Sequence, residues 1–365
     1  MAALLGYLST IRVAVSFFPL VAFLFTLPYL IHGYRKYGSV PLMRSLVVYS
    51  FILYIICVYF LVILPLPDHV DDGAGIRIQA EPFRFVRLFL ENSGFVYGDK
   101  STWIPAIKTV NFYTTVLNVI MFFPLGVYLH YYFRRGFFLT GFIGFVGSLF
   151  CEFTQITGVY GMFTPYRLFD VDDLIVNTFG ALLGWLLSPL ITFILPSRER
   201  IDEDAYLIGR NVTLMRRMMA FLIDFLILRI PVVIINEKLL GGGIVSFVIT
   251  DSIICILYFS LMSYLSHGRS IGRFILGTRL ATLSNHRVKL CQCFVRYIIL
   301  CGFTTHIYQF IKLTDGTPLV FVFRGFVLLI AAETVINFFT SKKLFLYDRI
   351  SGTYNINTIY REPEF

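Results

Sequence analysis

Ionisable and amide side chains gather where two apolar segments meet, at positions that a lipid bilayer normally denies to them. Glu152 and Gln155 lie three residues apart near the end of one segment, so a helix presents them on one face. Asp170, Asp173 and Asn177 start the next segment at the spacing i, i+3 and i+7, again one helical face. Because such groups are costly at a membrane boundary and usually pair with one another, this cluster marks a candidate functional site.

Two further residues complete the cluster, and its chemistry admits three interpretations. Arg167 is the expected counter-charge, since a guanidinium can hold a carboxylate through two hydrogen bonds, and Asp172 adds a third aspartate. The polar face could bind the hydrophilic part of an outer-leaflet molecule, such as a lipid-linked headgroup. Glu152 and Asp173 could instead act as general acid and base in a hydrolytic site. A structural network that locks two helices together is the third interpretation.

Part of the acidic run has a simpler explanation. Acids at a helix N-terminus are favoured by unpaired backbone N–H groups and by the helix dipole, so Asp170 or Asp172 is expected to be a cap. Capping does not require all three aspartates, and Asn177 lies a full turn deeper and needs a partner. With no serine–histidine nucleophile and no phosphate loop, we rank binding or structure above catalysis and assign no catalytic residue.

Composition places these groups in a membrane protein. The chain is 57% hydrophobic and 15% charged, with a mean hydropathy of +0.75, which is outside the range of a soluble domain of this length. Apolar segments long enough for a spanning helix, roughly 20 residues, cover residues 13–31, 45–64, 111–131, 137–158, 171–195, 215–235, 242–264, 291–311 and 319–340. Runs this long and continuous are helical in lipid. We therefore predict an all-α fold: a polytopic integral membrane helical bundle with about nine transmembrane helices in two modules.

Charge and cysteine placement set orientation and exclude several partners. The net charge of +9 comes from basic residues that gather in every second loop, which by the positive-inside rule places the N-terminus outside and the C-terminus in the cytoplasm. The cluster around Asp170 then faces outward. Basic residues scattered between helices do not favour a nucleic-acid partner. The six cysteines lie in or beside apolar segments without ligand partners, so we predict no disulfide framework, no metal and no cofactor.

The chain divides near Pro196. We expect a first module over residues 1–195, a charged cytoplasmic linker over 196–213, and a second module with a cytoplasmic tail over 214–365. Within the long outer loop, residues 81–91 have the spacing of an amphipathic helix. It either lies in the membrane interface or packs over the bundle.

The second module carries its own charged residues. Arg217 and Asp224 lie two turns apart on one helix face, so Arg217 is expected to reach toward a carboxylate in the membrane. Asp224, Asp251 and Glu333 lie near mid-membrane by segment position, and Asp348 follows the last helix. Intramembrane acids often form ion pathways, but a charge-paired network explains them too. We favour the network, because no broken-helix or inverted-repeat pattern is visible.

The first module resembles the VanZ-like family of bacterial membrane proteins over roughly residues 45–195. The resemblance rests on the order and spacing of the polar cluster with two further elements: Asn118 with Phe123-Pro124-Leu125-Gly126, and Asn177-Thr178-Phe179-Gly180-Ala181. The outer loop departs from the Asn-Leu-Ile-Pro-Phe of family members and reads Ala80-Glu81-Pro82-Phe83. The founding member is associated with low-level resistance to teicoplanin, a glycopeptide that binds cell-wall precursors.

The resemblance implies a role in the bacterial cell envelope, at the cytoplasmic membrane. The ligand site that it implies comprises Asn118, Glu152, Gln155, Arg167, Asp170, Asp172, Asp173 and Asn177. Expected partners are membrane lipids and either a cell-wall precursor or the glycopeptide itself. The leading hypothesis is a non-enzymatic contribution to glycopeptide resistance or envelope maintenance, with a membrane hydrolase acting on a lipid-linked substrate as one alternative.

The second module resembles the RDD family over about residues 210–353. We place the arginine and two aspartates that name the family on Arg217, Asp224 and Asp348, and Gly268-Arg269-Ser270-Ile271-Gly272-Arg273 stands between them. Some RDD relatives have been linked to ion exchange. The resemblance therefore implies, as the second alternative function, an ion or small-solute transporter that uses the intramembrane carboxylates.

Overall fold

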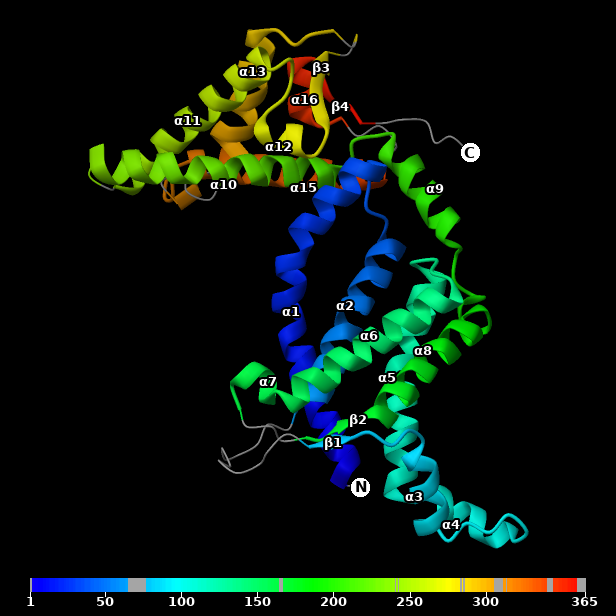
Figure 1. Cartoon of the computed structure of the whole chain (residues 1–365). Coiled ribbons are helices and arrows are strands. Elements are labelled where there is room, and N and C mark those ends of the chain that lie inside the picture. Colours follow the sequence, from blue (N-terminus) through cyan, green and yellow to red (C-terminus); the bar gives the residue numbers. More distant parts are fainter. Residues whose placement is uncertain are drawn as a thin grey trace. The chain divides into compact units, whose positions relative to one another are not determined.

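The chain forms two compact, almost entirely helical units. The computed structural model describes residues 2–64, 77–163, 167–239, 241, 243–282, 284, 286–304, 311–312, 314–339 and 344–359. The first unit comprises Met1–Thr26 and Leu42–Ile201, and the second comprises Leu27–Pro41 and Asp202–Phe365. Nearly every described segment in Figure 1 is a helix, which confirms the predicted all-α class.

The first unit is built on long helices joined by short elements. The long helices are α1 (Ala2–Tyr37, which continues into the second unit), α2 (Leu42–Ile63), α5 (Val110–Tyr131), α6 (Phe137–Ile156) and α8 (Val171–Thr192). The short elements are β1 (Ile78–Gln79), α3 (Arg84–Asn92), η1 (Lys100–Thr102), α4 (Trp103–Ile107), α7 (Gly158–Gly161) and β2 (Phe169–Asp170). β1 and β2 pair in parallel, with Gln79 opposite Asp170, and this pairing brings the segment between α2 and α5 to the start of α8.

The second unit combines long helices with a small sheet. Its elements are α9 (Arg198–Gly209, which begins in the first unit), α10 (Leu214–Leu239), α11 (Ile244–Leu265), α12 (Ile271–Ile275), β3 (Thr278–Thr282), α13 (Leu290–Tyr297), the π-helix η2 (Ile298–Thr304), α15 (Leu319–Phe339), α16 (Leu346–Ser351) and β4 (Thr353–Asn357). β3 and β4 are antiparallel, from Thr278 opposite Asn357 to Thr282 opposite Thr353.

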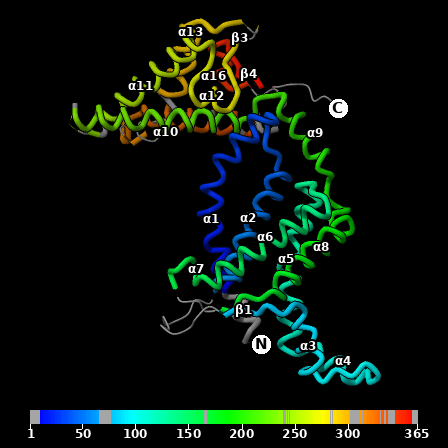
Figure 2. Tube along the Cα trace, in the orientation of Figure 1, coloured from blue at the N-terminus to red at the C-terminus, as the bar shows by residue number. Residues whose placement is uncertain are grey.

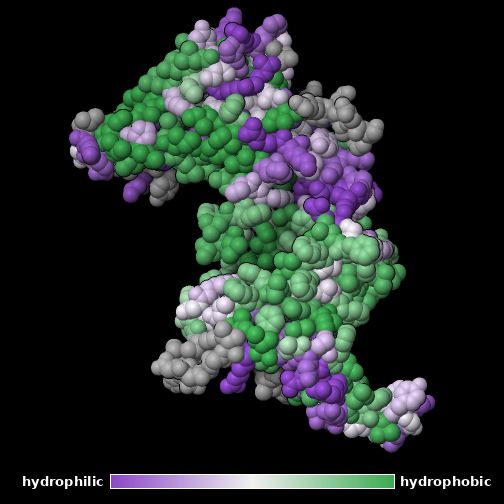
Figure 3. All heavy atoms as spheres, viewed as in Figure 1, coloured by the Kyte–Doolittle hydropathy of each residue, from purple (hydrophilic) through white to green (hydrophobic). Residues whose placement is uncertain are grey.

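Seven helices in the described part of the chain are long and apolar enough to cross a membrane: α1, α2, α5, α6, α8, α10 and α11. α15 covers the last predicted segment. The predicted segment 291–311 differs from expectation, because α13 gives way to a π-helix at Ile298, and part of it lies outside the described residues. Figure 3 shows hydrophobic atoms over broad helical surfaces, as expected where side chains meet lipid rather than water.

The closest helix packing in the first unit joins α5 to α8. A Cβ atom at Gly126 would collide with the Ala181 carbonyl oxygen, and one at Gly184 would collide with that of Phe123. Small residues let the backbones of membrane helices approach each other in this way. Figures 1 and 2 show α6 beside the same pair. Gly126, from the first sequence motif, and Gly184 therefore set the distance between α5 and α8, two of the helices that carry the polar cluster.

The chain passes from the first unit to the second between Ile201 and Asp202, within the predicted linker 196–213, which contains helix α9. The end of α1 also groups with the second unit. Arg216 explains this grouping: it is fully buried and donates to the carbonyl oxygens of Gly38 at 3.0 Å and Leu276 at 2.9 Å. These carbonyls lie at the C-terminal ends of α1 and α12, where the helix dipoles favour a cation.

Candidate functional site

Most of the predicted cluster lines one cavity of about 330 Å³ in the first unit, which we call the polar cavity. Its polar lining consists of Asn118, Glu152, Gln155, Arg167, Asp173 and Asn177. Its other lining residues are Ile11, Leu61, Val62, Leu117, Ile120, Met121 and Cys151. The cavity therefore combines a polar side from α5, α6 and α8 with an apolar side that includes α1 and α2.

Two carboxyl groups meet in the polar cavity. The side chains of Glu152 and Asp173 both line it and interact with each other. Asn118 donates to Asp173 Oδ1 at 2.6 Å, and the backbone N–H of Asp170 donates to Glu152 Oε2 at 2.9 Å. Glu152 is 3% exposed. The pair is thus held by hydrogen bonds from the Asn118 side chain and the Asp170 backbone.

Asn177 has the partner that its depth required. Its amide nitrogen donates to Ser148 Oγ at 2.9 Å, and Ser148 in turn donates to the Asp173 carbonyl oxygen at 3.3 Å. The Asn177 side-chain oxygen is buried and has no hydrogen-bond partner among the described residues. Sequence reasoning missed Ser148, although it lies one turn before Glu152 and so on the same helical face.

The three aspartates have three different roles. Asp170 is the N-cap of α8 and accepts from the Asp172 backbone N–H at 2.8 Å, as predicted for one of the acids. Asp172 accepts from the Phe85 N–H at 2.8 Å, so it caps the first turn of α3 from another part of the chain. Asp173 is left as the aspartate that lines the polar cavity.

Asp170 also anchors the segment between α2 and α5. Gln79 of β1 donates to Asp170 Oδ1 at 3.3 Å. Burial raises the pKa of the Asp170 carboxyl, while the hydrogen bond from the Asp172 backbone and the charge of Arg84 act in the opposite direction. The sequence did not indicate that Gln79 and Arg84 lie near Asp170, because this proximity depends on how the segment that carries them folds back.

Arg167 and Gln155 line the polar cavity, but neither belongs to the hydrogen-bonded group around Glu152 and Asp173. Arg167 is exposed and forms no ion pair with the described residues, so the expected pairing with a carboxylate is not formed. Gln155 donates to the Val62 carbonyl oxygen at 3.0 Å and ties α6 to the end of α2. The amphipathic helix predicted over 81–91 exists as α3, held to the bundle by Asp172.

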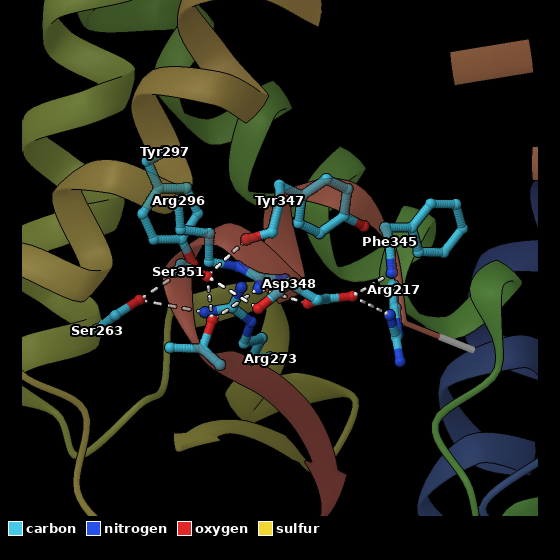
Figure 4. A network of polar contacts seen from close by, with 10 residues as sticks. Arg217, Ser263, Arg273, Arg296, Tyr297, Phe345, Tyr347, Asp348 and Ser351 are labelled. Atoms are coloured by element: carbon cyan, nitrogen blue, oxygen red, sulfur yellow. Dashed lines mark hydrogen bonds and ion pairs between the residues drawn. The ribbon is translucent and has the colours of Figure 1, made fainter. Parts of the chain in front are cut away.

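In the second unit, Asp348 joins two arginines. Arg217 Nη1 lies 2.9 Å from Asp348 Oδ2, and Arg296 donates to the other carboxylate oxygen. Figure 4 shows Asp348 between the two guanidinium groups. Arg296 also donates to Thr353 Oγ1 at 2.9 Å, and the neighbouring Tyr347 has its pKa raised by burial. Arg217 thus pairs with the distant Asp348, not with Asp224 two turns along its own helix.

Asp224 is satisfied by neutral groups instead. Its oxygens accept from the Tyr258 hydroxyl at 2.9 Å, the Gly272 N–H at 2.8 Å and the Ser270 hydroxyl. The residue is 1% exposed. Gly272 is required here, since a Cβ atom would collide with the Ala220 carbonyl oxygen. Asp224 therefore fixes α12, which carries part of the glycine–arginine motif, to α10 and α11.

The other two acids of the second unit lie in separate surroundings. Asp251 is 1% exposed and pairs with Arg229 at 3.4 Å. Glu333 is half-buried and accepts a hydrogen bond from the Leu346 backbone at the start of α16. The described contacts thus place Asp224, Asp251 and Glu333 in three different sets.

Comparison with known proteins identifies two families in this chain. Residues 51–192 match the model of the VanZ/LLP1 family, and residues 212–352 match that of the RDD family. No curated protein and no solved structure gives a significant match. The polar cavity lies in the first matched region, and the bridge from Arg217 to Asp348 lies in the second.

Proposed function

The chain carries a VanZ/LLP1-family domain followed by an RDD-family domain, and on that premise we propose that its polar cavity binds the hydrophilic part of a cell-envelope molecule. Through this binding the protein contributes to glycopeptide resistance or envelope maintenance in a bacterial membrane. The alternating basic loops of the sequence support an outward-facing cavity, with the C-terminus in the cytoplasm.

The observation that carries the proposal is the two-sided lining of the polar cavity. The carboxyl pair of Glu152 and Asp173 offers hydrogen-bonding oxygens, and the exposed Arg167 offers a cation that no described residue neutralises. Leu61, Leu117 and Ile120 add apolar surface beside them. An amphiphile with a polar head and a hydrocarbon chain meets both needs, which fits a lipid-linked cell-wall precursor.

The unused acceptors in the same region support binding over a purely structural network. The Asn177 side-chain oxygen and Asp172 Oδ1 are buried and lack hydrogen-bond partners among the described residues. A buried acceptor without a donor costs about 1–3 kcal/mol. Donors on a bound head group, such as hydroxyl or amide groups of a sugar or peptide, would recover that cost at Asn177, which lines the cavity.

The carboxyl pair also favours hydrolysis of a lipid-linked substrate as a second candidate. Two interacting carboxyl groups can serve as general acid and base when one is protonated and the other ionised, with Glu152 and Asp173 in those roles. A hydrolytic site additionally needs a water or other nucleophile near both groups. Turnover of a lipid-linked precursor by the intact chain, and its absence in Asp173→Asn, would favour this candidate over binding alone.

The proposal is tested by a binding measurement on the full chain in lipid nanodiscs. The ligands are a lipid-linked cell-wall precursor and teicoplanin, each titrated against wild type, Asp173→Asn and the matched variant Asp315→Asn. Asp315 is 75% exposed and lies outside the polar cavity, so its substitution controls for loss of one carboxylate. We expect Asp173→Asn to weaken binding of one ligand and Asp315→Asn to leave it unchanged. Wild-type protein that binds neither ligand would contradict the proposal.

A further inference from the structure

A second cavity, of about 450 Å³, lies within the second unit and brings three arginines together. Arg217, Arg273 and Arg296 line it, with Asp224 as the carboxylate of the same lining. We call it the arginine cavity. Figure 4 shows the three guanidinium groups around the Asp348 network. Guanidinium groups are suited to phosphate, because their planar donors match its oxygens.

The nearby carboxylates do not neutralise these three cations. Asp348 is a single carboxylate bridging both Arg217 and Arg296. Asp224 accepts from Tyr258, Ser270 and Gly272, all of them neutral donors. Arg273 donates to the neutral Ser263 hydroxyl at 3.1 Å. The lining therefore keeps an excess of positive charge, which is costly away from water unless an anion accompanies it.

Unused donors accompany this charge. The Nε groups of Arg217 and Arg296 are buried and have no hydrogen-bond partner in the part of the chain that the structure describes. Arg296 is 2% exposed, and the Arg217 side chain is 10% exposed. Buried donors are usually hydrogen-bonded, so these two cavity-lining residues keep donor capacity that no described residue uses.

The rest of the lining is apolar and continues onto the open side of α10. Met218, Leu222 and Phe225 line the cavity, and Met218 and Leu222 are 57% and 44% exposed. Exposed apolar side chains on a spanning helix face hydrocarbon. A free phosphate ion would make no use of this surface, whereas a hydrocarbon chain attached to the phosphate would cover it.

We propose that the arginine cavity binds the phosphate of an anionic membrane lipid, with the hydrocarbon chains along the exposed face of α10. The site lies at the start of α10, on the side where the basic loops place the cytoplasm, and anionic lipids of the cytoplasmic leaflet are attracted to such segments. The proposal concerns the second unit alone, so its test does not depend on what the polar cavity binds.

The test is native mass spectrometry of the full chain in detergent. The probes are phosphatidylglycerol, phosphatidylcholine with the same acyl chains, and inorganic phosphate. The variants are Arg273→Gln, which removes a cation that holds no carboxylate, and Met218→Glu, which puts a negative charge on the apolar wall. Arg324→Gln is the control, because Arg324 lies on α15 with its side chain 57% exposed and outside the cavity lining.

We expect the intact chain and Arg324→Gln to retain phosphatidylglycerol in preference to phosphatidylcholine. Arg273→Gln and Met218→Glu should each lower that retention about tenfold, the size expected for one lost charge-assisted contact. If Arg273→Gln fails to fold, the result with Met218→Glu decides the test, because the Met218 side chain is on the surface. Equal retention of the two lipids, unchanged retention in Met218→Glu, or inorganic phosphate bound as tightly as phosphatidylglycerol would overturn the proposal.

Discussion

Asn118 and Asp173, which lie 55 residues apart in sequence, are joined by a 2.6 Å hydrogen bond from the amide nitrogen to Oδ1. The bond links α5 to α8 and points the Asp173 carboxyl toward Glu152 in the polar cavity. One amide thus orients a carboxyl pair whose two members come from different helices.

We predict that Asn118→Ala and Asp173→Ala are energetically coupled. Each should lower the free energy of unfolding by about 1–3 kcal/mol, because each leaves the other partner of this half-buried hydrogen bond unsatisfied. The double variant should cost less than the two changes added together, by about 0.5–3 kcal/mol. Thermal unfolding in detergent measures the cycle. Thr114→Ala, one turn earlier on α5, is the control, since that exposed hydroxyl bonds to its own helix.

The packing of α5 on α8 predicts a sharp difference between two glycines. Gly126→Ala places a methyl group against the Ala181 carbonyl oxygen and should destabilise the first unit by about 1–3 kcal/mol or more. Gly136→Ala should be tolerated, because a Cβ atom at Gly136 meets nothing within 4 Å. Comparing the melting temperatures of the two variants checks this. Equal melting temperatures would mean that the two helices do not approach as closely as described.

Asp348 should be among the least replaceable residues of the second unit. Asp348→Asn leaves Arg217 and Arg296 without their shared carboxylate and should cost about 3–5 kcal/mol. The same substitution at Asp315, which is 75% exposed and 4.0 Å from Arg324, should change stability by less than about 1 kcal/mol. Urea or thermal unfolding of both variants gives the comparison. A tolerated Asp348→Asn would argue against the bridge.

The pH dependence of stability should contain a contribution from Asp170. Burial raises the pKa of this carboxyl in the folded state, so its contribution is fully present below the unfolded pKa and is lost as the pH rises through the folded value. Asp170→Asn keeps an N-cap oxygen but cannot ionise. The variant should therefore gain melting temperature relative to wild type as the pH rises above the ordinary aspartate pKa of about 4. A difference that is constant with pH would contradict the assignment.

Helical spacing was enough to predict much of the polar cavity from sequence. Glu152 and Gln155 are three residues apart, and Asp173 and Asn177 are four apart, so each pair shares a face by helix geometry alone. The long apolar segments likewise predict the spanning helices, because their length matches the thickness of a bilayer. The expectation that one aspartate is a cap is met by Asp170.

Contacts between distant segments could not be predicted from helical spacing or segment length. Asp172 caps α3, and Arg217 pairs with Asp348 131 residues away, since both contacts depend on where loops and tails return. A local pattern had instead suggested Arg217 near Asp224. The grouping of the end of α1 with the second unit depends in the same way on Arg216. Its partners are backbone carbonyls, which no residue type in the sequence indicates.

The most direct test of the central claim is the teicoplanin susceptibility of a sensitive Gram-positive host. The host expresses the intact chain, Glu152→Ala, Asp173→Ala or Asp224→Ala, with membrane levels matched by immunoblot. Our account predicts that the intact chain protects, that both polar-cavity variants lose protection, and that Asp224→Ala in the second unit retains it. Protection that survives in Glu152→Ala and Asp173→Ala, or a well-expressed intact chain that does not protect, would contradict it.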